Sequence, residues 1–111
     1  MPFEEITLGN ALIRNPQNLL SEHKFNLGEI ETEVTIKLYQ SLHQNRIVFR
    51  QSHFIKTPLQ AGPYQTSRPY NDDEDSALAQ VIRGFTDRYV EAVKAGCVPS
   101  ESWLIPNEDF S

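Results

Sequence analysis

Hydrophobic and polar residues alternate most clearly over residues 33–42. The apolar positions of one parity are Val34, Ile36, Leu38 and Leu42. A period of two over this length predicts a β-strand with one buried face. A second strand is predicted over residues 46–57, where Ile47, Phe49 and Ile55 share one parity. The two segments together predict a central β-hairpin over about 33–57.

The loop between these strands sets the register of the hairpin. A loop of even length, residues 44–45 or 43–46, puts Leu42 opposite Ile47 and Leu38 opposite Gln51. It also puts Ile36 opposite His53, Val34 opposite Ile55, Glu33 opposite Lys56, Thr35 opposite Phe54 and Tyr39 opposite Arg50. A loop of odd length would turn one strand over and expose its apolar face, so burial selects the even loop.

The segments before the hairpin give weaker patterns. Apolar residues of one parity over 6–13 predict a first strand. Residues 16–27 are ambiguous, because His23, Phe25 and Leu27 alternate, whereas Leu19 and Leu20 among charged residues fit a short helix equally well.

A long amphipathic helix is predicted over about 72–95. Asn71 is a suitable N-cap, Glu74 lies three residues later as in a capping box, and Gly96 fits the position after the C-cap. The apolar stripe with a period near 3.6 is formed by Leu78, Val81, Ile82, Phe85, Tyr89, Ala92 and Val93.

The remaining segments are a loop and an apolar tail. Prolines and Gly62 interrupt residues 57–70, which predicts a loop that is long for a compact domain. The tail carries Trp103, Leu104, Ile105 and Phe110, which is too apolar for a free tail and favours docking on the domain or on a partner. We therefore predict a single α+β domain over residues 1–111, with an antiparallel meander packed against one C-terminal helix.

Composition limits the function classes. The chain has 111 residues, a net charge of −5 and 39% hydrophobic residues, which fits one globular domain. The net acidity argues against a protein that binds duplex nucleic acid through a basic face. No apolar run reaches the roughly 18 residues of a membrane span, and the acidic N-terminus lacks a secretory pattern. We expect a cytoplasmic protein.

The single cysteine, Cys97, excludes an internal disulfide and fits a reducing compartment. A reactive thiol and a small half-buried apolar residue are the two interpretations, and the second explains its place after the helix.

Two polar residues on the predicted core face form a first candidate site. In a small pocket His53 would act as an acid–base group and Gln51 would orient a ligand. Alternatively, the core face of the sheet is only partly covered, and these residues lie at the end of that face that solvent reaches.

A second candidate site lies in the loop before the helix. Arg68 between Tyr64 and Tyr70 could bind an anion, a planar ligand or a carboxylate. The acidic residues 72–75 would oppose an anionic ligand, and they could instead pair with Arg68 and fix the loop.

The sequence shows no metal or cofactor motif. The acidic residues 72–75 lack the spacing of a calcium loop and are explained as a charged helix start. The three histidines and Cys97 have no paired ligand spacing. A phosphate loop, a dinucleotide fingerprint and a nucleophile elbow are absent from the sequence, and we expect no catalytic residue and no cofactor.

The outer face of the predicted hairpin is a candidate interaction surface. It carries Tyr39, Val48 and Phe54 among basic residues. Aromatic residues between basic residues suit a surface that stacks single-stranded bases. The same pattern serves a protein interface, or a face that the N-terminal segment covers.

We expect a non-enzymatic protein-interaction or regulatory module. The alternatives are a small-ligand binder or enzyme that uses His53, Gln51 and Arg68, and a single-stranded nucleic-acid binder that uses the outer hairpin face.

Self-association as a homodimer is also expected. Tyr39, Val48 and Phe54 would be exposed together on the second sheet face, and Trp103 also needs cover. Ala77, Gly84 and Ala95 form a line of small residues that would allow another backbone to approach the helix. In the alternative, the N-terminal segment covers the second sheet face and the tail folds back within one chain.

Overall fold

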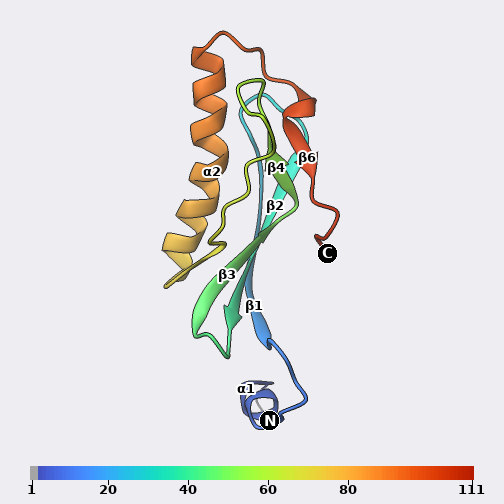
Figure 1. The fold of residues 1–111 in the computed structure, drawn as a ribbon, viewed down its shortest axis with the longest axis vertical. Coiled ribbons are helices and arrows are strands. Elements are labelled where there is room, and N and C mark those ends of the chain that lie inside the picture. The colour runs from blue at the N-terminus through green and yellow to red at the C-terminus, as the bar shows by residue number, and fades with distance from the viewer. Residues whose placement is uncertain (1–2) are drawn as a thin grey trace.

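A computed structural model describes residues 3–111 of the chain (Figure 1). In chain order the elements are helix α1 (Phe3–Leu8), strands β1 (Gln17–Asn26), β2 (Glu33–Ser41), β3 (Arg46–Gln51), β4 (His53–Ile55) and β5 (Tyr70–Asn71), helix α2 (Glu74–Lys94), the 3₁₀ helix η1 (Glu101–Trp103) and strand β6 (Leu104–Pro106).

The strands form two antiparallel sheets. The larger sheet has the order β1-β2-β3-β5, and β4 pairs with β6 in a two-stranded sheet. Helix α2 lies along one face of the larger sheet, as Figure 1 shows. We call this face the inner face and the opposite one the outer face. The α+β class, the antiparallel meander and the single long helix are confirmed.

The molecule is elongated, with extents of 54 × 23 × 23 Å. Helix α1 lies at the opposite end from the C-terminus of α2 (Figure 1). The segment 6–13 was expected to be a strand, and this prediction is wrong, because residues 3–8 are helical. The ambiguous segment 16–27 is strand β1, which pairs with β2 along its length and has a bulge between Leu19 and Ser21. No helix within residues 3–111 is long and apolar enough to cross a membrane.

The hairpin has the expected faces but a different register. Leu38 lies opposite Phe49, Ile36 opposite Gln51 and Tyr39 opposite Val48. The predicted pairing is therefore wrong by two residues. The four-residue loop 42–45 keeps the even length that burial required, because a shift of two residues leaves every side chain on its face.

The predicted second strand is divided at Ser52. Its backbone N–H donates to the carbonyl of Thr35 at 2.9 Å, and its hydroxyl accepts the Thr35 N–H at 2.8 Å. The chain then leaves β2, and β4 pairs with β6 from the tail. The expected pairs Val34–Ile55 and Thr35–Phe54 consequently do not form.

Helix α2 begins two residues later than predicted. Its N-cap is Asp73 rather than Asn71, and the Asp73 carboxylate accepts the N–H of Ser76 at 2.7 Å. The C-cap is Ala95, and Gly96 follows with φ of +90°, which is the left-handed conformation expected after a helix end.

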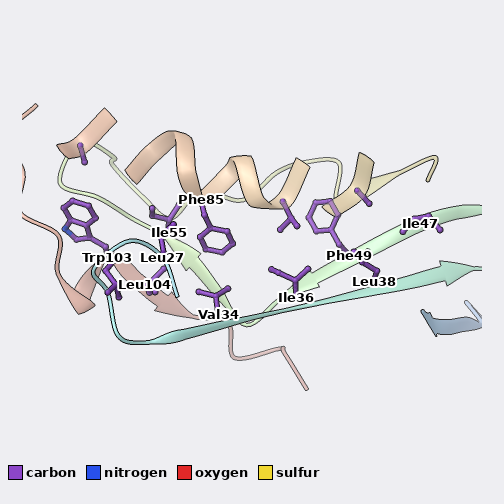
Figure 2. Packing of buried hydrophobic residues seen from close by; sticks show 14 residues of the cluster. Leu27, Val34, Ile36, Leu38, Ile47, Phe49, Ile55, Phe85, Trp103 and Leu104 are labelled. Atoms are coloured by element: carbon purple, nitrogen blue, oxygen red, sulfur yellow. The ribbon is translucent and has the colours of Figure 1, made fainter. Parts of the chain in front are cut away.

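The core lies between α2 and the inner face, and it extends to the tail (Figure 2). Its buried hydrophobic residues are Leu27, Ile30, Val34, Ile36, Leu38, Ile47, Phe49, Ile55, Ala77, Val81, Phe85, Ala92, Trp103 and Leu104. Val93 of the predicted stripe is exposed.

The tail docks within the same chain. Trp103 is 3% exposed, and its ring meets that of Tyr89 edge to face at 5.6 Å. Both carboxylate oxygens of Glu101 accept backbone N–H groups of the turn between β1 and β2, from Glu31 at 2.8 Å and from Thr32 at 2.9 Å. The tail thus joins the turn of the β1–β2 hairpin to the core.

Candidate interaction surface

Four side chains form a row across the outer face of the larger sheet. Leu19 lies opposite Tyr39, Tyr39 opposite Val48, and Val48 opposite Tyr70. Each of the four strands therefore contributes one side chain. The row lies on the outer face because its members alternate with the buried residues of the inner face. Leu19 is 56% exposed, and the other three side chains are half-buried.

Three arginines cover the two tyrosines of this row. The guanidinium of Arg46 lies 3.6 Å from the ring centre of Tyr70, and that of Arg50 lies 4.9 Å from the ring centre of Tyr39. The Nε–H of Arg68 donates to the Tyr70 hydroxyl at 3.4 Å. We call these seven residues the Tyr/Arg face: Leu19, Tyr39, Arg46, Val48, Arg50, Arg68 and Tyr70.

Among residues 3–111, the arginines of the Tyr/Arg face have no carboxylate partner. Within residues 3–111, no carboxylate lies within 4.0 Å of any of the three guanidinium groups. By contrast, Lys24 pairs with Glu33 at 3.9 Å and Lys37 pairs with Glu22 at 3.8 Å. Lys37 also donates to the carbonyl of Ser111 at 2.8 Å. The neighbouring lysines are thus compensated, whereas the arginines leave a local positive charge on an acidic protein.

This charge acts on Tyr70. The hydrogen bond and the charge of Arg68, together with the weaker effect of Arg46, hold the pKa of the Tyr70 hydroxyl below its ordinary value. A positive neighbour favours the phenolate, which explains the direction.

The residues predicted to bind a small ligand do not form one site. The side-chain amide of Gln51 donates to the carbonyl of His53 at 2.9 Å. Nδ1 of His53 lies 2.8 Å from the hydroxyl of Ser52. Burial lowers the pKa of His53, because desolvation disfavours the imidazolium. These two side chains are used in local bonds at the break between β3 and β4.

Gln51 and Tyr64 line a cavity in the core, but it is small. Its volume is about 10 Å³, which is space for roughly one water molecule. His53 is not among its lining residues. Tyr64 instead packs over Gly84, with the guanidinium of Arg88 at 3.5 Å from its ring centre. Gly84 was expected to allow the backbone of another element to approach the helix. In the structure this space is filled by the ring of Tyr64 from the same chain.

Arg68 and Tyr70 lie elsewhere, at a shallow hollow of about 310 Å³ beside the start of α2. Asn71, Asp72 and Gln80 also line it. The amide of Gln80 donates to the carbonyl of Arg68 at 2.9 Å, which fixes the loop against the helix. The predicted grouping of Tyr64 with Arg68 and Tyr70 is not found.

The residues predicted as an interface lie in three places. Tyr39 and Val48 are central in the Tyr/Arg face. Phe54 borders a hollow of about 210 Å³ together with Arg50 and Pro69, so it adjoins this face. Trp103 lies in the core. Its apolar surface needs no second subunit for cover.

Sequence reasoning missed Leu19 and the pairing of Tyr70 with Val48. Tyr70 falls in a proline-rich loop, where a two-residue strand has no detectable period. A bulge after Leu19 interrupts the alternation of β1, which hid the face to which Leu19 belongs.

Metal ligands and the thiol give no second site. Within residues 3–111, no three His, Cys, Asp or Glu side chains are close enough together to hold a metal ion. Cys97 is half-buried and packs against the core. Comparison with known protein families, with curated proteins and with solved structures gives no match to this chain.

Proposed function

We propose that this protein is a non-enzymatic interaction module that holds a partner protein on its Tyr/Arg face. The observation that carries the proposal is the row of Leu19, Tyr39, Val48 and Tyr70 across four strands, covered by three arginines without carboxylate partners among residues 3–111. Tyrosine and arginine are among the residue types enriched at the positions that dominate binding energy in protein interfaces.

The shape of the face suits a protein partner better than a small molecule. The residues of the row come from four adjacent strands and stand on a broad sheet surface, whereas the hollows beside it are shallow. Small ligands usually bind in concave pockets that bury most of their surface. His53, Gln51 and Arg68, the residues of the small-ligand alternative, do not line one pocket.

The arginines of the face indicate the chemistry of the partner. A partner that brings aspartate or glutamate side chains would form bidentate hydrogen bonds with Arg46, Arg50 and Arg68. Two copies stacked outer face to outer face would instead bring these arginines together. This repulsion disfavours the homodimer through the outer face that the sequence suggested.

Single-stranded nucleic acid is the second candidate. Tyr39 and Tyr70 stand in one row with arginines beside them, which is a pattern that binds bases and phosphates. However, arginine already covers one face of each tyrosine ring, which leaves at most the other face of each ring for base stacking. We therefore place the protein partner first.

Co-purification from the native cell tests both candidates. We would compare the wild-type protein with the double variant Arg46→Glu, Arg50→Glu, and use Arg83→Glu, Lys94→Glu as the control. The control makes the same change in charge at exposed positions of α2. We expect the wild type and the control to retain the same partner and the outer-face variant to lose it.

Two outcomes decide between the candidates. If the outer-face variant retains the partner, the Tyr/Arg face is not the binding surface. If nuclease treatment removes the bound material and oligodeoxythymidylate binds with a strong salt dependence, the second candidate replaces the first.

A further inference from the structure

Strand β1 leaves a long free edge on the larger sheet. It spans Gln17–Asn26 and pairs only with β2 in that sheet, among the residues that the structure describes. The carbonyl of Thr35 accepts the backbone N–H of Ser52, and the N–H of Thr35 donates to the Ser52 hydroxyl. Both backbone groups of Thr35 thus point to the β3 side, so the alternate residues of β2, such as Ile36, bond to β1. Their partners in β1 are Ser21, His23 and Phe25.

The backbone groups of Glu22 and Lys24 consequently point away from β2. In an antiparallel ladder the residues between two bonded positions direct their N–H and C=O groups to the other side. These groups therefore form the free edge, and their side chains stand on the outer face beside Lys37 and Thr35. Such an edge is a template for another strand.

We propose that β1 pairs with β1 of a second copy of this chain. The two strands run antiparallel about a twofold axis at His23, so that His23 faces itself. Glu22 then lies opposite Lys24 of the second copy, and Lys24 lies opposite Glu22 of the second copy. The result is one continuous sheet with four strands from each chain.

Charge selects this register over its neighbours. A twofold axis perpendicular to the sheet keeps each side chain on its face, so the register can shift only in steps of two residues. The next register in one direction puts Glu22 opposite Glu22, and the next in the other puts Lys24 opposite Lys24. Like charges directly opposite each other are destabilising, and opposite charges are stabilising.

The charges within each chain extend the same alternation. Within one chain, Oε1 of Glu22 lies 3.8 Å from Nζ of Lys37, and Nζ of Lys24 lies 3.9 Å from Oε1 of Glu33. Across the new interface the order becomes Lys37, Glu22, Lys24 of the second copy and Glu33 of the second copy. Positive and negative side chains alternate over all four strands.

The helix does not obstruct this pairing. Helix α2 packs mainly on β3, β4 and β5 and less on β2, and it meets β1 through the rings of Phe85 and Phe25, whose centres lie 5.7 Å apart. Glu22 and Lys24, whose backbone groups form the free edge, remain exposed. The same axis puts both Tyr/Arg faces on one side of the joined sheet. The dimer would thus offer two copies of the proposed binding surface to one partner, although its formation does not depend on that function.

Sedimentation equilibrium of the full chain tests the proposal. We expect the wild type to have twice the monomer mass at micromolar concentration. In Glu22→Lys, and separately in Lys24→Glu, both cross-strand pairs become like-charged. Dimerisation should weaken by about tenfold or more, because two pairs change sign. Glu91→Lys, an equal charge change at an exposed position of α2, should remain dimeric.

Mixing the two single variants gives the sharpest result. The Glu22→Lys variant carries lysine at both positions 22 and 24, and the Lys24→Glu variant carries glutamate at both. Every cross-strand pair of a mixed dimer is then oppositely charged, so the mixture should dimerise at least about tenfold more strongly than either variant alone.

Recovery on mixing also shows that both variants are folded. A monomeric wild type would overturn the proposal. A dimer that the single variants leave unchanged, or a mixture of the two variants that stays monomeric, would overturn it as well.

Discussion

The hydroxyl of Tyr89 occupies the space in which a side chain at Gly28 would stand. A Cβ atom at this position would lie 2.2 Å from the hydroxyl oxygen, and Gly28 has φ of +54°. The same hydroxyl accepts the N–H of Glu29 at 3.2 Å. Helix α2 is therefore fixed to the turn between β1 and β2 through a contact that requires glycine.

We expect Gly28→Ala to destabilise the protein by about 2–4 kcal/mol, because overpacking and an unfavourable φ act together. Chemical denaturation measures the free energy of unfolding. Gly62→Ala is the control, because nothing lies within 4 Å of a Cβ at Gly62. If Gly28→Ala lowers the free energy of unfolding by no more than Gly62→Ala does, the hydroxyl of Tyr89 does not fill this space.

The contact of Tyr64 with Gly84 gives a second prediction. A Cβ at Gly84 would lie 3.1 Å from Cε2 of Tyr64. Alanine in place of glycine inside a helix gains about 1 kcal/mol from propensity alone. We expect most of this gain to be lost in Gly84→Ala and to return when Tyr64→Ala is also present. A double-mutant cycle measures the difference, and equal gains in both backgrounds would show that the ring does not press on the helix.

Glu101 gives a prediction about pH. Hydrogen bonds from the hydroxyl of Thr32 and from the backbone of Glu31 and Thr32 hold the pKa of Glu101 below its ordinary value of 4.5. A carboxyl group with a lowered pKa in the folded state stabilises the fold above its unfolded pKa. This stabilisation is lost as the pH falls through the folded pKa.

The melting temperature of Glu101→Gln should therefore be lower than that of the wild type at neutral pH. The difference should shrink when the pH falls below about 4.5. Glu91→Gln, at an exposed position on α2, should follow the wild type throughout. A difference for Glu101→Gln that stays constant with pH would show that the charge of Glu101 does not hold the tail to the turn.

Titration of Tyr70 tests the electrostatics of the Tyr/Arg face without any partner. The pKa of Tyr70 is lowered first by Arg68 and then by Arg46, so Arg68→Gln should raise it, and Arg46→Gln should raise it less. Ultraviolet absorbance detects phenolate formation as the pH rises. The Tyr70→Phe variant lacks the contribution of Tyr70, and its titration curve therefore identifies that contribution in the wild type. A pKa that neither variant changes would mean that the arginines do not act on this tyrosine.

The faces of the hairpin and the position of α2 were predictable because their signals are local and periodic. The alternation of Val34, Ile36 and Leu38 and the stripe through Val81 and Phe85 each repeat over many residues. Burial then fixed the even length of the hairpin loop, which the structure confirms.

The exact register and the strand break required tertiary contacts that have no period. Strand β3 ends at Gln51, and at the break the backbone N–H of Asn107 donates to the carbonyl of Ser52 at 2.8 Å. Asn107 lies in the tail and is distant from Ser52 in the sequence. The N-cap moved from Asn71 to Asp73 because Asn71 belongs to β5 and its amide donates to Gln80. Both residues are good caps, and only the neighbouring strand decides between them.

The candidate site was predictable in part. Tyr39, Val48 and Arg50 follow from the outward parity of the hairpin strands. Tyr70 and Arg68 reach the same face only because a proline-rich loop returns to β3, which no local pattern indicates. The row across four strands thus depends on the topology of the whole sheet.

Site-specific photocrosslinking in the native cell tests the central claim most directly. A photoreactive residue in place of Val48 stands in the middle of the Tyr/Arg face, whereas the same residue in place of Val90 stands on the exposed side of α2. We predict that Val48 gives one defined adduct that Arg46→Glu, Arg50→Glu abolishes, and that Val90 gives none. An adduct at Val90 with none at Val48, or an adduct at Val48 that persists in the charge-reversal variant, would contradict a partner on this face.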